Sequence, residues 1–154
     1  EKGHDLGNHS MNHPDMTKLS KEKQKIEIIQ AHDLVKELTG YEMDLFRPPY
    51  GAYNNQVIRT CYELNYYPIQ WDVDSLDWQD HSPEQIIANV CQHKNLGPGS
   101  IILCHNGADH TADVLDEILT NLKALGYEIV PISELILRED YYMDGTGRQK
   151  KDVR

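Results

Sequence analysis

The chain has 154 residues, which is enough for one domain with a sizeable core and hardly enough for two. Its formal net charge of −10 argues against docking on nucleic acid or on anionic lipid. No apolar run reaches the length of a membrane span. The three cysteines, Cys61, Cys91 and Cys104, lack metal-finger spacing, so we interpret them as small buried side chains.

The first half of the chain predicts a helix, a short strand and a second helix. Ser20 caps the first helix, which runs to Leu38 and stops at Gly40. Residues 43–46 form the strand, and residues 54–64 form the second helix, with Val57, Ile58 and Cys61 on its inward face. Two rows of the first helix are candidates for its buried face: Ile26, Ile29 and Leu34, or Ile28, Ala31, Val35 and Leu38.

The second half repeats this alternation. Residues 66–73 have strand composition, and Ser82 followed by Pro83 opens a helix. Residues 101–104 are entirely apolar, which predicts a strand buried on both faces, as in parallel sheets.

The remaining elements complete the pattern. Residues 111–125 predict a helix closed by Gly126, and residues 127–132 predict a strand. Ser133 is expected to cap a short final helix. The polar tail, residues 139–154, is expected to be loose.

Alternating strands and helices of this length predict an α/β fold around a parallel sheet. No glycine-rich phosphate loop follows any strand, so the pattern favours a partial β/α barrel over a Rossmann sheet. We assign residues 1–138 to this domain and residues 139–154 to the tail. In barrels of this kind the chemistry lies in loops at the carboxyl ends of the strands.

Four motifs follow or flank the predicted strands. His9 and His13 are four residues apart, so one helical turn or a compact loop aims both imidazoles at one point, where they suit zinc, cobalt or nickel. The loop Phe46-Arg-Pro-Pro-Tyr-Gly51 is stiffened by two prolines and presents Arg47, which fits a partner carboxylate.

The other two motifs come later in the chain. The segment Trp71-Asp-Val-Asp-Ser-Leu-Asp-Trp78 combines three acids with two indoles, which suit packing on a sugar or an acetyl methyl. In Leu103-Cys-His105 a histidine follows a buried strand, in the place of an acid or base. Taken alone, each motif also fits a plain interpretation: surface histidines, a stiff turn, a core tryptophan beside solvated acids, or a structural histidine.

Together the motifs resemble the NodB-type polysaccharide deacetylases, carbohydrate esterase family 4. The family pattern H-[ST]-x-x-H is matched by His9-Ser-Met-Asn-His13, and R-x-P-Y by Arg47-Pro-Pro-Tyr50. The D-W loop and the terminal L-x-H are matched by Asp77-Trp78 and Leu103-Cys-His105. The match runs to about Leu137.

The resemblance implies roles at the matching positions. His9 and His13 would bind a divalent metal, with zinc expected and cobalt or nickel as alternatives. The catalytic group would comprise His105 as general acid, Asp77 adjusting its proton affinity, Arg47 orienting the base, and the Tyr50 N–H at the oxyanion. Substrate contacts would come from the pocket residues Trp71, Leu103, Trp78 and Pro49.

The chain departs from the family in one respect, because it contains no adjacent pair of aspartates. The family uses such a pair as catalytic base and third metal ligand. We expect the pair to lie on an N-terminal segment outside this sequence, which would then be a partner of this chain. The alternative is a natural variant that lacks the base. Alone, the chain is expected to bind metal weakly and to be inactive.

The resemblance implies an enzyme that removes N-acetyl groups from N-acetylglucosamine-type polysaccharide, foremost bacterial peptidoglycan. Chitooligosaccharides and acetylated xylan are alternative substrates. A carbohydrate-binding domain without catalysis is a second hypothesis, and a plain metal-binding or structural module is a third. An extracellular or cell-wall location in bacteria follows from the substrate class alone.

Overall fold

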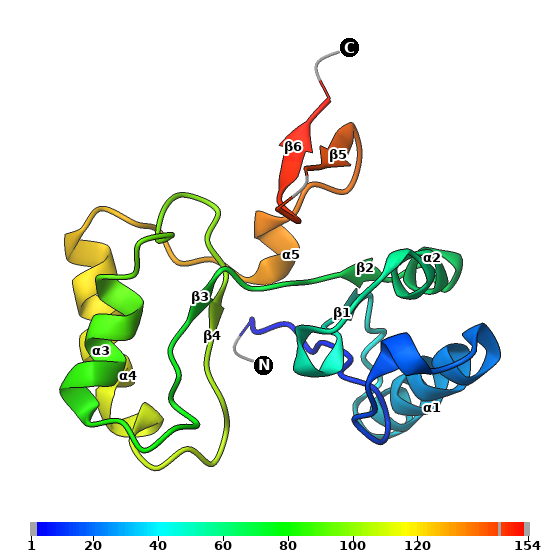
Figure 1. The fold of residues 1–154 in the computed structure, drawn as a ribbon, viewed down its shortest axis with the longest axis horizontal. Coiled ribbons are helices and arrows are strands. Elements are labelled where there is room, and N and C mark those ends of the chain that lie inside the picture. Colours follow the sequence, from blue (N-terminus) through cyan, green and yellow to red (C-terminus); the bar gives the residue numbers. More distant parts are fainter. Residues whose placement is uncertain (1–2, 145, 153–154) are drawn as a thin grey trace. The chain divides into compact units, whose positions relative to one another are not determined.

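The structure, a computed structural model, describes residues 3–144 and 146–152. The predicted α/β class is confirmed, because helices alternate with short parallel strands (Figure 1). The chain forms two compact units, Glu1–Gln70 with Tyr142–Lys150, and Trp71–Tyr141 with Lys151–Arg154. The strands of the described residues pair two by two, so they form no closed barrel.

The first unit begins with a loop and then alternates helices and strands. Its elements are η1 (Met16–Lys18), α1 (Lys21–Thr39), β1 (Leu45–Phe46), η2 (Pro49–Gly51), α2 (Asn55–Glu63) and β2 (Tyr67–Pro68). Strands β1 and β2 are parallel, and Asn8 forms an isolated parallel bridge with Phe46. Three chain segments therefore run side by side, with the polar loops following their carboxyl ends.

Helix α1 forms where the caps predict it. The Ser20 side chain accepts a hydrogen bond from the Lys23 backbone N–H, and Gly40 ends the helix at a φ of 73°, which a residue with a Cβ rarely adopts. Of the two apolar rows, the second faces the core, through buried Ile28 and partly buried Val35. Leu38, at the end of that row, is 73% exposed.

The other row of α1 is wrong as a core prediction, since Ile26, Ile29 and Leu34 are all exposed. The core instead takes in a polar residue of the same helix, Gln24. Its Nε2 donates to the Met16 carbonyl at 2.8 Å, and its Oε1 accepts from the Thr60 hydroxyl at 2.8 Å. Both amide ends are satisfied, so this buried side chain ties η1, α1 and α2 together.

The core of this unit is one apolar cluster: Met16, Ile28, Met43, Phe46, Val57, Cys61 and Tyr66. Helix α2 contributes Val57 and Cys61, as its spacing predicts, together with buried Thr60. Burial raises the pKa of the Cys61 thiol to about 12, so this side chain packs as a neutral, unreactive group. Cys91 and Cys104 are only half-buried, and all three cysteines are free.

The second unit contains β3 (Val73–Asp74), α3 (Pro83–Cys91), β4 (Ile102–Leu103), α4 (Thr111–Ala124) and α5 (Ile132–Leu135). Strands β3 and β4 are parallel, with Val73 opposite Ile102. Ser82 caps α3 and Pro83 takes its first position, as predicted. Helices α3 and α4 pack on each other and on β3 through a single cluster: Val73, Ile86, Val90, Val114, Ile118 and Leu122.

Several element predictions are wrong. The strand expected at 66–73 is two strands in different sheets, β2 and β3, separated by residues 69–72. The run 127–132 contains no strand, because no neighbour pairs with its backbone. Helix α5 starts at Ile132 after Pro131, so Ser133 lies inside it.

The tail is also more ordered than expected. Residues Tyr141–Met143 and Gln149–Lys151 form strands β5 and β6 of a two-stranded sheet. The Asp144 side chain caps the connecting turn by accepting from the Thr146 and Arg148 backbone N–H groups. Gly145 and the ends of the assigned ranges, residues 1–2 and 153–154, lie outside the described part of the chain. No helix of the described residues is long and apolar enough to cross a membrane.

Candidate functional site

The two predicted metal ligands lie in a compact loop that follows the Asn8 bridge, and not on a helix. The bridge fixes the start of this loop, since Asn8 N–H donates to the Leu45 carbonyl and Arg47 N–H donates to the Asn8 carbonyl. His9 Nδ1 lies 2.6 Å from the Arg47 carbonyl oxygen. A carbonyl only accepts, so Nδ1 carries the proton and Nε2 of the neutral ring carries the lone pair.

The loop then turns back so that His13 comes beside His9. Ser10 and His13 both adopt positive φ, 66° and 56°, and the Ser10 hydroxyl accepts the His13 backbone N–H at 2.9 Å. The two imidazole centroids lie 4.8 Å apart at an interplanar angle of 76°. His9 is half-buried and His13 is exposed. The sequence allowed either a helical turn or a compact loop to bring these two imidazoles together, and the structure has the compact loop.

These residues fit two ligands of a divalent metal of the zinc type. A carbonyl partner on Nδ1 is the usual way in which proteins present Nε2 to such an ion and fix the ring. Across the described residues there is no group of three or more His, Cys, Asp or Glu side chains that could hold a metal. The pair therefore provides part of a coordination sphere, and the identity of the metal stays a prediction.

The Arg47 loop belongs to the same unit and contacts the histidine loop. Pro49 is buried, and Tyr50 adopts φ 60° and ψ 7° inside η2. A non-glycine residue in this region is strained, and such strain concentrates at functional loops. The Tyr50 ring is 69% exposed and packs edge-on against His13, with centroids 4.6 Å apart. Burial lowers the pKa of the half-buried Arg47 guanidinium.

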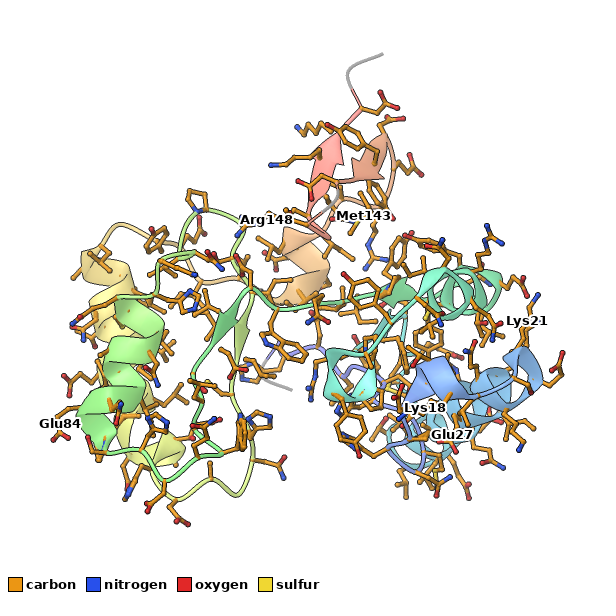
Figure 2. All side chains as sticks on the ribbon, in the orientation of Figure 1. Lys18, Lys21, Glu27, Glu84, Met143 and Arg148 are labelled. Atoms are coloured by element: carbon orange, nitrogen blue, oxygen red, sulfur yellow. The ribbon has the colours of Figure 1, made fainter. Side chains whose placement is uncertain are left out.

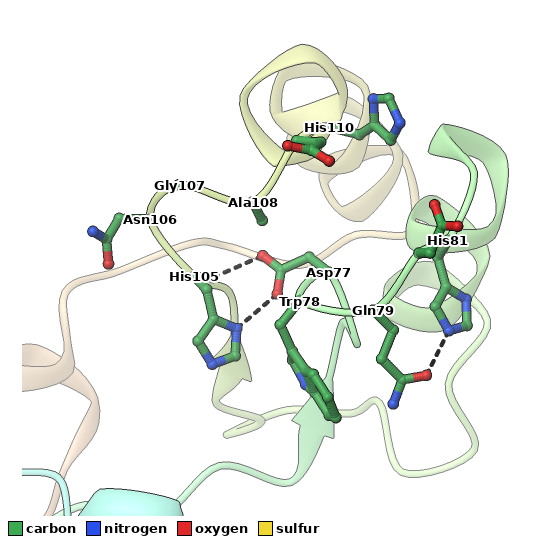
Figure 3. A pocket seen from close by; sticks show the side chains of 11 residues that line it. Asp77, Trp78, Gln79, His81, His105, Asn106, Gly107, Ala108 and His110 are labelled. Atoms are coloured by element: carbon green, nitrogen blue, oxygen red, sulfur yellow. Dashed lines mark hydrogen bonds and ion pairs between the residues drawn. The ribbon is translucent and has the colours of Figure 1, made fainter.

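In the second unit, Asp77 and His105 follow the parallel strands β3 and β4 and meet beyond their carboxyl ends. His105 Nδ1 lies 2.7 Å from Asp77 Oδ1, and the His105 backbone N–H donates to Asp77 Oδ2 at 2.7 Å (Figure 3). The Thr111 hydroxyl, at the start of α4, donates to the same Oδ2 at 2.6 Å. The carboxylate thus fixes the ring and its tautomer through Nδ1.

Asp77 remains ionised in this buried place. Burial of the carboxyl would raise its pKa, but the hydrogen bonds from Thr111, His105 and Ser75 outweigh burial and lower the pKa below its ordinary value. The Asp77 side chain is fully buried, whereas the His105 side chain is 33% exposed. A fully buried carboxylate therefore lies hydrogen-bonded to a partly exposed imidazole.

A pocket of about 500 Å³ opens beside this pair. Trp78 lies on its wall and is 61% exposed, which suits contact with a ligand (Figure 3). Leu103 is buried at 7% exposure and Trp71 is half-buried, and neither lines this pocket. The pocket wall is formed by Asp77, Trp78, Gln79, Asp80, His81, His105, Asn106, Gly107, Ala108, Asp109 and His110.

The structure thus brings the predicted residues together in two groups. His9, His13, Arg47 and Tyr50 meet in the first unit, and Asp77 and His105 meet in the second. Sequence reasoning missed Thr111, the third partner of Asp77, which it treated only as the start of a helix. It also missed Asn8 and Glu27, which bind the backbone of the histidine loop.

Comparisons with known proteins find similarity to polysaccharide deacetylases. Residues 1–69 match the family described as polysaccharide deacetylase. The chain is 33% identical over 137 residues to a peptidoglycan-N-acetylglucosamine deacetylase of Bacillus cereus, covering 86% of this chain and 49% of that protein. It is 39% identical over 135 residues to the deacetylase PgdA of Listeria monocytogenes, covering 88% of this chain and 28% of that protein.

Solved structures give the same picture. The Bc1960 peptidoglycan N-acetylglucosamine deacetylase matches with a TM-score of 0.81 and 33% identity, over 87% of this chain and 64% of that one. BA3943 of Bacillus anthracis, described as a pseudoenzyme of carbohydrate esterase family 4, matches with a TM-score of 0.79 and 30% identity, over 84% of this chain and 45% of that one. A mutant of BA3943 is described as having restored enzymatic activity.

The resemblance drawn from the motifs is thereby confirmed. The chain spans about half or less of the curated relatives given above and under two thirds of the solved ones. Sequence and fold similarity nevertheless extend over most of the present chain, and both groups of site residues lie within residues 9–111.

Proposed function

Because the chain is homologous to part of the NodB-type polysaccharide deacetylases, we propose that its protein hydrolyses N-acetyl groups of N-acetylglucosamine-type polysaccharide. Each turnover would consume one water and release acetate, leaving a free amine on the sugar. Bacterial peptidoglycan is the substrate that the relatives favour, since both curated relatives carry it in their names. Chitooligosaccharides and acetylated xylan are substrates that would suit the same chemistry.

The observation that carries the proposal is the Asp77–His105 pair. An amine departs from a tetrahedral intermediate only when its nitrogen is protonated, so an amide hydrolase needs a positioned acid. His105 would supply that proton from Nε2, while the buried carboxylate of Asp77 orients the ring by holding Nδ1–H at 2.7 Å. Thr111 would keep the carboxylate oriented through its 2.6 Å hydrogen bond.

The first unit would supply the electrostatic part of the reaction. His9 and His13 would hold a divalent metal, with zinc expected and cobalt or nickel as alternatives, which when bound polarises a carbonyl and activates water. The Tyr50 backbone N–H would help to hold the oxyanion, and the strained φ of 60° at this residue supports that role. Arg47 would orient a carboxylate base through its guanidinium.

No residue of this chain is assigned as the base or as the third metal ligand, because its sequence has no adjacent aspartates. Both would come from a further segment of the protein, which would then be a partner of the present residues. The 154 residues alone should release no acetate.

The test is acetate release by the complete protein, loaded in turn with zinc and cobalt and supplied with peptidoglycan, chitooligosaccharide or acetylated xylan. The His105→Ala variant should lose about 100- to 10,000-fold in kcat, as expected for a general acid. His4→Ala is the matched control, because His4 is exposed and lies outside both groups, and it should retain activity. Absence of acetate release from every metal and substrate would refute the proposal.

A second function is favoured by one comparison. BA3943, which matches with a TM-score of 0.79, is described as a pseudoenzyme. The corresponding proposal is a glycan-binding domain in which Trp78 and the pocket beside His105 contact sugar without turnover. Retention of peptidoglycan binding together with no acetate release would support it, and acetate release would exclude it.

A location outside the cell or in the cell wall follows from the proposed substrate, since peptidoglycan lies there. Fractionation of cells that express the complete protein, followed by detection of this chain, tests that location.

A further inference from the structure

The backbone of the loop that carries His9 and His13 is hydrogen-bonded by two side chains outside the H-x-x-x-H motif. We propose that Asn8 and Glu27 are positioning residues that preorganise the two imidazoles for a divalent cation. The proposal rests on the metal-binding part of the proposed function. It assigns the two residues no contact with the cation itself.

Glu27 lies on helix α1 (Figure 2), and its carboxylate binds the loop. Its Oε2 accepts the backbone N–H of Asn12 at 2.8 Å and that of Met11 at 3.1 Å. Its Oε1 accepts the Asn12 side-chain amide at 2.9 Å. One carboxylate therefore binds the backbone N–H groups of both residues between Ser10 and His13, and carboxylate acceptors make the stronger kind of hydrogen bond.

Asn8 holds the inner side of the loop and is only 2% exposed. Its Nδ2 donates to the Ile28 carbonyl at 2.8 Å and to the Tyr66 hydroxyl at 3.2 Å, which anchors the side chain in α1 and the core. Its Oδ1 accepts the Ser10 backbone N–H at 2.9 Å. Donors and acceptor of this amide are all used, so its orientation is fixed.

The loop needs this support because its backbone is locally unfavourable. Ser10 and His13 both lie in the left-handed region, which is unfavourable for a non-glycine residue unless surrounding contacts compensate. The acceptors on Asn8 and Glu27 serve the three consecutive N–H groups of Ser10, Met11 and Asn12. Without them the loop would relax, and a cation would have to order it at the moment of binding.

A side-chain network extends the inner anchor. The Tyr66 hydroxyl that meets Asn8 also lies 2.6 Å from His32 Nδ1, and His32 Nε2 lies 2.9 Å from Glu42. This chain of contacts fixes the hydroxyl rotor on which the Asn8 amide depends. The loop is thus tied to the surface of α1 by Glu27 and to the core by Asn8.

The experiment compares Zn²⁺ and Co²⁺ affinity by calorimetry for the wild-type protein and for Glu27→Ala, Glu27→Gln and Glu37→Ala. Glu27→Ala should weaken binding by roughly 10- to 100-fold, the usual cost of losing a residue that orients metal ligands. Glu27→Gln should restore most of it, since its Oε1 can accept the same two peptide N–H groups and Asn12 can turn its amide. Glu37 is an exposed glutamate of the same helix, so Glu37→Ala should change nothing.

A second readout needs no metal: amide hydrogen exchange of Met11 and Asn12. Both amides should exchange at least about tenfold faster in Glu27→Ala than in the wild type, because they lose their acceptor. Unchanged exchange of these amides, or a metal affinity in Glu27→Ala equal to that of wild type, overturns the positioning role of Glu27. Equal losses in Glu27→Ala and Glu27→Gln overturn it also, because charge and not positioning would then be responsible.

The two readouts test the positioning role and the proposed function separately. Faster exchange in Glu27→Ala, with no metal bound by wild type, supports Glu27 as an anchor of the loop and contradicts its role in metal binding. Metal binding by wild type with no effect of Glu27→Ala supports the metal site and contradicts the positioning role. Asn8→Asp keeps the acceptor for the Ser10 N–H but sets a carboxylate oxygen against the Ile28 carbonyl, so it should both weaken metal binding and lower the unfolding free energy.

Discussion

The histidine loop of the first unit and the Asp77–His105 pair of the second are built on opposite principles. The loop lies at the surface, and its order comes from backbone N–H groups that donate hydrogen bonds to Asn8, Ser10 and Glu27. The pair depends on the fully buried carboxylate of Asp77, which is hydrogen-bonded to the His105 ring, the His105 backbone N–H and the Thr111 hydroxyl.

This difference predicts how each site is linked to folding. A buried charge contributes to stability as long as its partners remain, and its removal leaves several hydrogen-bond donors without an acceptor. A surface loop can lose its order while the core below it stays intact. Changes in the pair should therefore lower both function and stability, whereas loss of Glu27, which holds the loop at the surface, should leave the unfolding free energy nearly unchanged.

The largest effect is expected from Asp77→Ala. The variant leaves the Thr111 hydroxyl and the His105 backbone N–H without their acceptor, and we expect at least about 2 kcal/mol of lost unfolding free energy. Urea denaturation measures it. Asp109→Ala is the control, since Asp109 is an exposed aspartate on the same pocket wall and should shift the free energy by less than about 0.5 kcal/mol. Equal effects of the two variants would show that the buried pair is not a stability element.

A second effect follows from the lowered pKa of Asp77. A carboxyl group with a lower pKa in the folded state stabilises the fold above the unfolded pKa of about 3.9, and this contribution disappears as pH falls through the folded value. The unfolding free energy of wild type should therefore exceed that of Asp77→Asn by a constant amount near pH 5, and the gap should shrink below about pH 4. Urea titrations between pH 5 and pH 3 measure it. A gap that stays constant across this range contradicts the prediction.

The sequence predicted what local chemistry decides. Ser20 and Ser82 capped helices as expected, because a cap needs only the backbone N–H groups two or three residues ahead. Strand pairing is not local, so residues 66–73 were wrongly joined into one strand and residues 127–132 were wrongly assigned to another. Strand composition states that a segment suits a sheet but not that a neighbour is present.

The candidate site divides along the same line. His9, His13, Asp77 and His105 were found because motifs fix their spacing, and the structure adds the contacts among them. Asn8 and Glu27 were missed. Glu27 looks in sequence like any solvated glutamate of a helix, and its partners lie 15 and 16 residues away. Only the fold of the loop over α1 reveals that role.

The smallest effect tests whether the strain in the first unit is real. Tyr50 has φ 60°, and any side chain with a Cβ is strained there, whereas glycine is not. Tyr50→Gly should therefore be more stable than Tyr50→Ala by about 1 kcal/mol, the reverse of the order expected at an ordinary position. Urea denaturation of the two variants measures the difference, and the exposed Tyr50 ring is lost equally in both. If alanine proves the more stable, this residue relaxes out of the left-handed region in solution, and the fixed backbone N–H on which its proposed role depends is not there.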